Sequence, residues 1–173
     1  MSKHRSSTTH RRKIAIATLA VAAVGVPSAA MASQSAAPAG SPSATSAAAT
    51  DQQEVVDLVN SERSKAGCEP LTVNEKLTKA AQDHSEDMAA HDNMSHTGSD
   101  GSSPGDRIER AGYSWSAYGE NVAYGYDSPK SVMEGWMNSS GHKANILNCD
   151  FKEIGVGLAQ PGNYWTQDFG TAR

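Results

Sequence analysis

Three side chains from separate segments of the 173-residue chain have the types that metal binding and acid–base chemistry require. Glu120 stands among small and apolar residues in the stretch Tyr-Gly-Glu-Asn-Val-Ala at 118–123, His96 lies in a polar segment, and His142 follows Ser-Ser-Gly. Imidazole and carboxylate groups are common ligands of Zn²⁺, and a Glu beside a bound water can act as a base. Each residue is therefore a candidate for metal binding, with Glu120 as the candidate catalytic residue if there is one, although no local pattern brings the three together.

Each of these residues also has a purely structural interpretation. Glu120 is expected in a turn after Gly119, where its carboxylate would accept backbone N–H groups and hold the turn. His142 is expected near a helix N-terminus, where the helix dipole disfavours a protonated ring, and it would bond a nearby carbonyl. An exposed loop residue such as His96 has no role by itself. Residue types alone leave both interpretations open.

Four short segments follow one another along the chain: Ser-His at 95–96, the stretch at 118–123, Gly-His-Lys-Ala-Asn-Ile-Leu-Asn at 141–148, and Tyr-Trp-Thr-Gln-Asp-Phe at 164–169. In this order and spacing they resemble the CAP superfamily of cysteine-rich secretory proteins, venom allergens and plant pathogenesis-related proteins, including its secreted bacterial branch. The resemblance covers roughly residues 55–169. It implies an α+β fold, a three-layer αβα sandwich around a small antiparallel sheet, with the two His and the Glu lining one cleft.

The chain departs from the family at one position of this cleft. Eukaryotic members carry a second Glu one turn after a helical Trp, whereas Ser139 stands three residues after Trp136 here. Glu134 is near in sequence but lies on a different face of the helix, so it is a weak candidate. The resemblance therefore implies His96, Glu120 and His142 as ligands of Zn²⁺ or another divalent cation, with one position open for water.

The resemblance fixes no reaction, because CAP domains serve several unrelated functions. We expect first a binding module, monomeric, that holds a divalent cation and recognises an extracellular glycan, protein or lipid. A metal-dependent hydrolase acting on peptide or cell-wall bonds is the alternative, since a His/His/Glu cleft suits that chemistry although no nucleophile motif accompanies it. A lipid-binding carrier ranks last, because the sequence shows no long apolar stripe beyond what a core needs.

The first 50 residues are typical of targeting and linker segments. Residues 1–32 combine a basic start, a short apolar run and an Ala-Met-Ala pattern, which predicts a secretory signal peptide rather than an uncleaved anchor. Residues 33–50 are almost entirely Ala, Ser, Pro, Thr, Gln and Gly, which predicts a disordered linker. We therefore expect a CAP domain at 51–173 in a secreted, extracellular protein, either free or associated with the cell wall, without a stable membrane anchor.

Charge and cysteine content narrow the partners and the compartment. The chain has 15 Lys and Arg against 19 Asp and Glu. The charged residues that cleavage of the signal would remove are all basic. A strongly acidic mature protein argues against nucleic acid as a partner. The two cysteines, Cys68 and Cys149, predict a disulfide in an exported protein, with free thiols or a Cys/His metal site as alternatives.

The elements that must position the candidate residues follow from periodicity and capping signals. Besides the helix expected near His142, helices are expected over residues 51–66, 74–91 and 103–112 and after Ser128-Pro129. The second should bury His84 and expose His91, and the fourth should bury Trp136. Gly155 and Gly157 alternate with apolar residues, which predicts a strand whose bare face admits another element, followed by a partner strand over residues 163–169.

Overall fold

The computed structural model describes residues 44–173. Its helices are α1 (Ala44–Lys65), α2 (Glu75–His91), α3 (Pro104–Arg110), α4 (Pro129–Met137) and α5 (Ser140–Ile146). Its strands are β1 (Thr72–Val73), β2 (Trp115–Tyr124), β3 (Glu153–Ala159) and β4 (Tyr164–Ala172). The predicted signal peptide and residues 33–43 of the predicted linker lie outside the described residues. Within residues 44–173, no helix is both long and apolar enough to cross a membrane.

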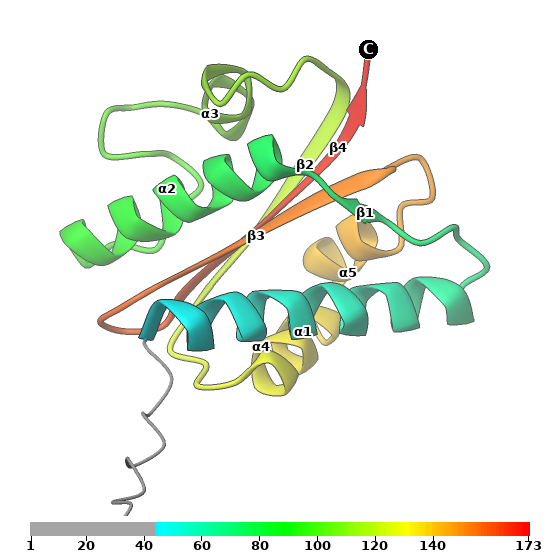
Figure 1. Ribbon diagram of the computed structural model, residues 1–173, viewed down its shortest axis with the longest axis horizontal. Coiled ribbons are helices and arrows are strands. Elements are labelled where there is room, and N and C mark those ends of the chain that lie inside the picture. The colour runs from blue at the N-terminus through cyan, green and yellow to red at the C-terminus, as the bar shows by residue number, and fades with distance from the viewer. Residues whose placement is uncertain (1–43) are drawn as a thin grey trace, which may run out of the picture. The chain divides into compact units, whose positions relative to one another are not determined.

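The strands form one sheet in the order β1-β3-β4-β2, so β2 is an edge strand. Strands β2, β4 and β3 pair antiparallel, whereas the two-residue β1 joins β3 in parallel. Helices α2 and α3 cover one face of the sheet, and α1, α4 and α5 cover the other (Figure 1). This arrangement is the three-layer α+β sandwich that the resemblance implied, with one short parallel strand added at an edge.

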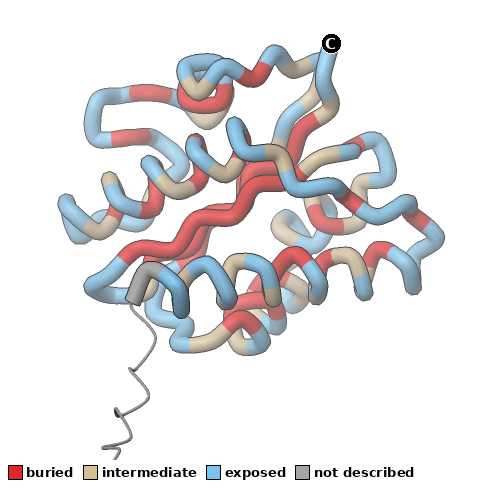
Figure 2. The backbone as a smooth tube through the Cα atoms, viewed as in Figure 1, coloured by how far each residue is buried: buried red, intermediate tan, exposed pale blue. Residues whose placement is uncertain are grey.

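The buried residues concentrate along the strands and on the helix faces turned toward them (Figure 2). On the side of α1, α4 and α5, Trp136 is 1% exposed and packs with Val55 and Ile146, which confirms that Trp136 is a core residue. On the other side, α2 lies almost directly on β3. A Cβ atom added at Gly155 would come 2.1 Å from the backbone of Leu77, so the predicted bare face is what admits α2.

The helix starts follow the predicted capping residues. The Asn74 side chain accepts the backbone N–H groups of Lys76 and Leu77 at the start of α2. Ser103 and Ser128 each form a reciprocal capping box at the starts of α3 and α4, with Pro as the following residue. These caps satisfy amide groups that would otherwise have no partner, and they confirm the predicted N-termini of all three helices.

Two local predictions are wrong. Residues 44–50 of the predicted linker are helical and form the first turns of α1, because Ala is the strongest helix former and Ala48 packs against the core. The segment around Glu120 is not a turn but the middle of β2. Gly119 serves there to make room, since a Cβ atom at this position would lie 3.0 Å from the ring of Phe151.

The predicted disulfide is confirmed. Cys68 follows α1, Cys149 follows α5, and their sulfur atoms are bonded with the Cα atoms 5.0 Å apart. The bridge closes a loop with a sequence separation of 81 residues. It therefore ties the end of α1 to the segment that leads into β3.

A buried arginine reinforces the same junction. Arg63 in α1 is fully buried, and burial lowers the pKa of its guanidinium. Its nitrogens donate to four backbone carbonyls, at 2.8–3.1 Å, on Glu69, Ile146, Asn148 and Phe151. The side chain thus satisfies carbonyl groups at the end of α5 that have no helical partner.

Candidate functional site

Glu120 lies in the middle of β2, on the sheet face that α2 and α3 cover, and its side chain is 2% exposed. Its Oε1 atom lies 2.7 Å from Nδ1 of His96, and its Oε2 atom lies 2.5 Å from Nη2 of Arg107. A carboxylate only accepts hydrogen bonds, so both nitrogens donate. Each carboxylate oxygen of Glu120 therefore has a donor already.

Arg107 in α3 links Glu120 to the loop that carries His96. Besides Glu120, its terminal nitrogens donate to the carbonyl oxygens of Ser102 at 2.9 Å and His96 at 3.1 Å. Arg107 is a site residue that was not predicted from the sequence. The signal available was a basic residue next to Ile108, on the inward face of a helix, in a fold that has to compensate the charge of Glu120.

His96 stands at the surface of the site, with its side chain 55% exposed. Its Nδ1–H group donates to Glu120, which leaves Nε2 as the ring atom with a free lone pair when the imidazole is neutral. The hydrogen bond from the ring to Glu120 raises the pKa of His96 above its ordinary value. His96 and Glu120, which were expected to line one cleft, are thus in direct contact.

His84 is buried under the same carboxylate, as predicted for a core residue. Its Nε2 atom lies 2.8 Å from the carbonyl oxygen of Ser95 and 4.0 Å from Oε2 of Glu120. The carbonyl can only accept, so Nε2 carries the hydrogen, and burial lowers the pKa of the ring. His84 is therefore a neutral neighbour of Glu120. His91 is exposed, as predicted, and lies 3.1 Å from Asp87.

Three amides fix α5 against the outer edge of β2. Asn121 donates to the carbonyl of His142 at 3.1 Å and to Gln167 at 3.0 Å. Asn145 donates to the Asn121 side chain at 2.9 Å and to the backbone carbonyl of Glu120 at 3.2 Å. Asn145 thus bonds the backbone of β2, whereas Gln167 bonds the side chain of Asn121. These bonds also cover part of an edge strand that would otherwise be open to pairing.

His142 reaches the edge of β2 from the opposite layer to His96. It lies near the start of α5, as predicted, and is half-buried. Burial lowers the pKa of its ring, and so does the nearby His96. His96 and His142 thus approach neighbouring residues of β2, Glu120 and Asn121, from different sides of the sheet.

The other expected ligand positions do not join this cluster. Glu134 is exposed on α4, and Ser139 is the N-cap residue of α5. None of the hydrogen bonds or ion pairs that hold Glu120 involves Glu134. Across residues 44–173, no group of three or more His, Cys, Asp or Glu side chains is placed to hold an ion. Of the three residues expected as ligands, His96 and Glu120 are in direct contact, whereas the hydrogen bonds of Glu120 do not include His142.

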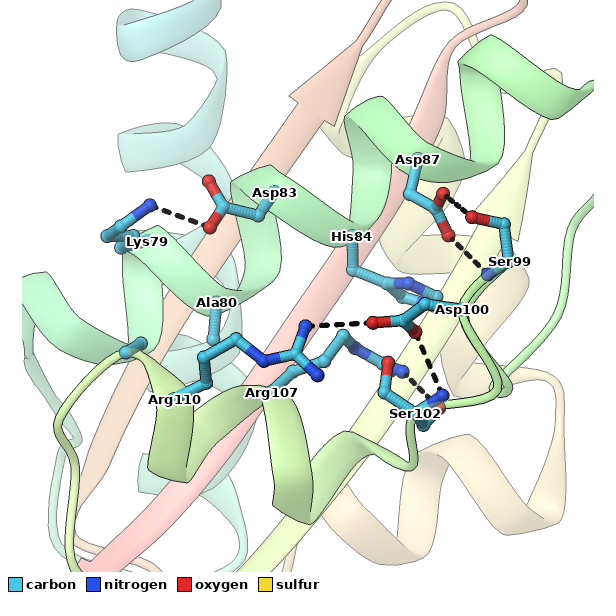
Figure 3. Close-up of a pocket in the computed structure, with 11 residues that line it drawn as sticks. Lys79, Ala80, Asp83, His84, Asp87, Ser99, Asp100, Ser102, Arg107 and Arg110 are labelled. Carbon is cyan, nitrogen blue, oxygen red and sulfur yellow. Dashed lines mark hydrogen bonds and ion pairs between the residues drawn. The ribbon is translucent and has the colours of Figure 1, made fainter.

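A hollow of about 370 Å³ lies on the inner side of this cluster, between α2, the segment 99–102 and α3 (Figure 3). His84 and Arg107 lie between it and Glu120. Two ion pairs lie in its walls, Lys79 with Asp83 at 2.7 Å and Arg110 with Asp100 at 3.0 Å. Charged side chains at these positions would have to be desolvated to admit an acyl chain.

Comparison with known proteins places this geometry in a family. The model of the cysteine-rich secretory protein family, CAP, matches residues 56–169. The uncharacterized protein YkwD of Bacillus subtilis strain 168 is 42% identical over 127 residues, which are 73% of this chain and 49% of that protein. Pathogenesis-related protein 1C of Nicotiana tabacum is 28% identical over 104 residues, 58% of this chain and 52% of that protein. The chain thus spans about half the length of these two relatives.

Solved structures agree with the family match. An extracellular protein containing an SCP domain from Bacillus anthracis strain Ames superposes with a TM-score of 0.71 and 29% identity, over 76% of this chain and 44% of that one. An outer surface protein of Borrelia burgdorferi shares the fold with a TM-score of 0.68, over 72% of this chain and 94% of that one, at 23% identity. The family match covers more than half of the chain, and therefore the chain belongs to the cysteine-rich secretory protein (CAP) family.

Proposed function

We propose that the chain is an extracellular binding module whose cleft at the edge of β2 takes a divalent cation on His96 and His142. Glu120 holds His96 in this proposal and does not itself ligate the ion. The observation that carries the proposal is the 2.7 Å hydrogen bond from Nδ1 of His96 to Glu120. A carboxylate in this position fixes the ring tautomer, orients the ring and makes the other nitrogen a better ligand.

The state of the second imidazole supports the same function. The lowered pKa of His142 keeps its ring neutral near neutral pH, and only a neutral imidazole can ligate. Two imidazoles favour Zn²⁺, Cu²⁺, Ni²⁺ or Co²⁺ over Ca²⁺ or Mg²⁺, which prefer oxygen ligands. Water or a ligand atom from a partner would complete the coordination. The partner class remains that of an extracellular glycan, protein or lipid.

A binding role is favoured over hydrolysis by the burial of Glu120. A metal-dependent hydrolase needs a base that can reach bound water, whereas the Glu120 side chain is only 2% exposed and lies beneath His96 and Arg107. Lipid transport ranks lower because several charged side chains line the hollow beside the cluster (Figure 3).

Calorimetric titration of the purified full-length protein with ZnCl₂ tests the proposal. His96→Ala and His142→Ala should each weaken binding at least about tenfold, and the double variant should not bind at this site. His91→Ala is the matched control, because His91 is an exposed imidazole on α2 outside the cluster. Zn²⁺ binding by the double variant as tight as that of the natural chain would refute the site.

A second measurement separates binding from hydrolysis. The Zn²⁺-loaded protein is incubated with casein and with peptidoglycan, with and without a chelator. We expect no cleavage. Chelator-sensitive cleavage that disappears in His96→Ala would support the hydrolase instead.

A further inference from the structure

Asp168 is a fully buried acid in the middle of β4, directly opposite Glu120 in the register between β2 and β4. Residues directly opposite each other in an antiparallel pair project from the same face of the sheet. Both carboxyl groups therefore lie on the face covered by α2 and α3. On the other side of β4 the partner residue is Gly155, which contributes no side chain.

The guanidinium of Arg107 faces Asp168 but, within the described part of the chain, donates no hydrogen bond to it. The titratable groups that face Asp168 are Glu120 from β2 and Arg107 from α3, and His84 from α2 lies 4.0 Å from Glu120. The terminal nitrogens of Arg107 donate to Glu120 and to two carbonyls, and His84 is neutral. Within the described part of the chain, neither oxygen of Asp168 has a hydrogen-bond donor while both acids are ionised. An ionised carboxylate in this position would be very costly.

A single proton on this pair of acids supplies the missing hydrogen-bond donor. Two ionised carboxylates contain no donor, whereas one carboxylic acid beside one carboxylate forms a strong O–H···O hydrogen bond. Glu120 receives hydrogen bonds from Arg107 and His96, so it is the group that remains an anion. Burial, followed by the neighbouring charge of Glu120, raises the pKa of Asp168 well above its ordinary value.

We propose that Asp168 is a neutral carboxylic acid whose O–H donates to Glu120, and that Asp168 thereby positions the Glu120 carboxylate for His96. The result is a hydrogen-bonded chain from the core to the cleft, Asp168 to Glu120 to His96. With a third donor, Glu120 is held in one orientation and His96 is held in the Nδ1–H tautomer. The use of this orientation for cation binding by His96 rests on the proposed function, whereas the hydrogen-bonded chain itself does not.

Infrared difference spectroscopy tests the protonation state in the metal-free, full-length protein near neutral pH. The natural chain should show the carbonyl-stretch band of a protonated carboxylic acid, and Asp168→Asn should lack it. Glu120→Gln removes the other acid and should change the band's position without abolishing it. A natural chain without such a band overturns the proposal.

Nitrogen NMR of the His96 ring tests the positioning role, again without metal and at a pH where the ring is neutral. The natural chain should show the Nδ1–H tautomer. Asp168→Asn should keep it, because an amide N–H replaces the acid O–H, and Asp168→Val should give a mixture of tautomers. Loss of the tautomer in the Asn variant, or full retention in a folded Val variant, overturns the role. If the Val variant does not fold by circular dichroism, the Asn variant and the infrared band decide.

Discussion

The guanidinium of Arg107 in α3 lies 2.5 Å from the carboxylate of Glu120 in β2, and both side chains are buried. This pair determines what the family's central acid can do in this chain. Glu120 is held as an anion between a permanent cation and an imidazole, in a place where an uncompensated charge would be costly. The Glu120 carboxylate in turn sets the orientation, the tautomer and the pKa of the His96 ring, which is the exposed member of the cluster.

The first prediction is that Glu120→Gln lowers the pKa of His96. The hydrogen bond to the carboxylate is the largest cause of the raised pKa, and an amide cannot stabilise the imidazolium in the same way. By linkage, a raised folded-state pKa stabilises the natural chain fully below the ordinary His pKa. That contribution is lost as the pH rises through the folded-state pKa.

Proton NMR titration of the ring protons measures this change. The ring protons of His91, which lies outside the cluster beside Asp87, serve as the internal reference. An unchanged His96 pKa in Glu120→Gln would mean that the 2.7 Å contact does not persist in solution.

The second prediction concerns the contact between α2 and β3. Gly155→Ala should lower the free energy of unfolding by at least about 3 kcal/mol, because its Cβ would lie 2.1 Å from backbone atoms of Leu77 that have no freedom to move aside. Gly141→Ala is the matched control. Its Cβ would meet nothing within 4 Å, and in α5 it should raise stability by about 0.5–1 kcal/mol. Urea unfolding of both variants checks the contrast, and equal effects would contradict it.

Much of the scaffold could be predicted from the sequence because its signals are local. Asn74, Ser103 and Ser128 cap helices through side chains that reach only two or three residues along the chain. The glycines of β3 mark a close approach whichever element makes it. The start of α1 escaped prediction because alanine-rich composition is shared by linkers and helices, and packing of Ala48 against the core decides between them.

The site was harder to predict because its partners come from different layers. Family resemblance identified His96, Glu120 and His142, and the contact between His96 and Glu120 exists. Nothing in the sequence near Glu120 indicates Arg107, which is 13 positions away on another element. Asp168 was equally hidden, since its neighbour is set by the register between β2 and β4. Such pairs follow from topology and not from any local pattern.

The third prediction concerns Arg63. Arg63→Met keeps the length of the side chain but leaves the carbonyls of Ile146, Asn148 and Phe151 without this donor. A buried acceptor without a partner costs about 1–3 kcal/mol, so we expect a loss of at least about 3 kcal/mol. Lys65→Met, which breaks an exposed pair with Glu62, should change stability by less than about 1 kcal/mol. Thermal unfolding of the two variants, with the disulfide intact, distinguishes these outcomes.

The last prediction is the pH dependence of stability in Asp168→Asn. An acid with a raised folded-state pKa binds its proton more tightly when folded. Above the ordinary Asp pKa of 3.8, the unfolded natural chain therefore gains stability by ionising while the folded chain does not. The stability of the Asn variant relative to the natural chain should rise with pH from about 4 to 7, by at most about 1.4 kcal/mol per pH unit. Asp100→Asn is the control and should show no slope in this range, because hydrogen bonds from Ser102, followed by that from Arg110, lower the pKa of Asp100 and leave it ionised in both states. Urea unfolding of the three proteins across this range provides the comparison, and a flat difference for Asp168→Asn would show that Asp168 is ionised in the folded protein.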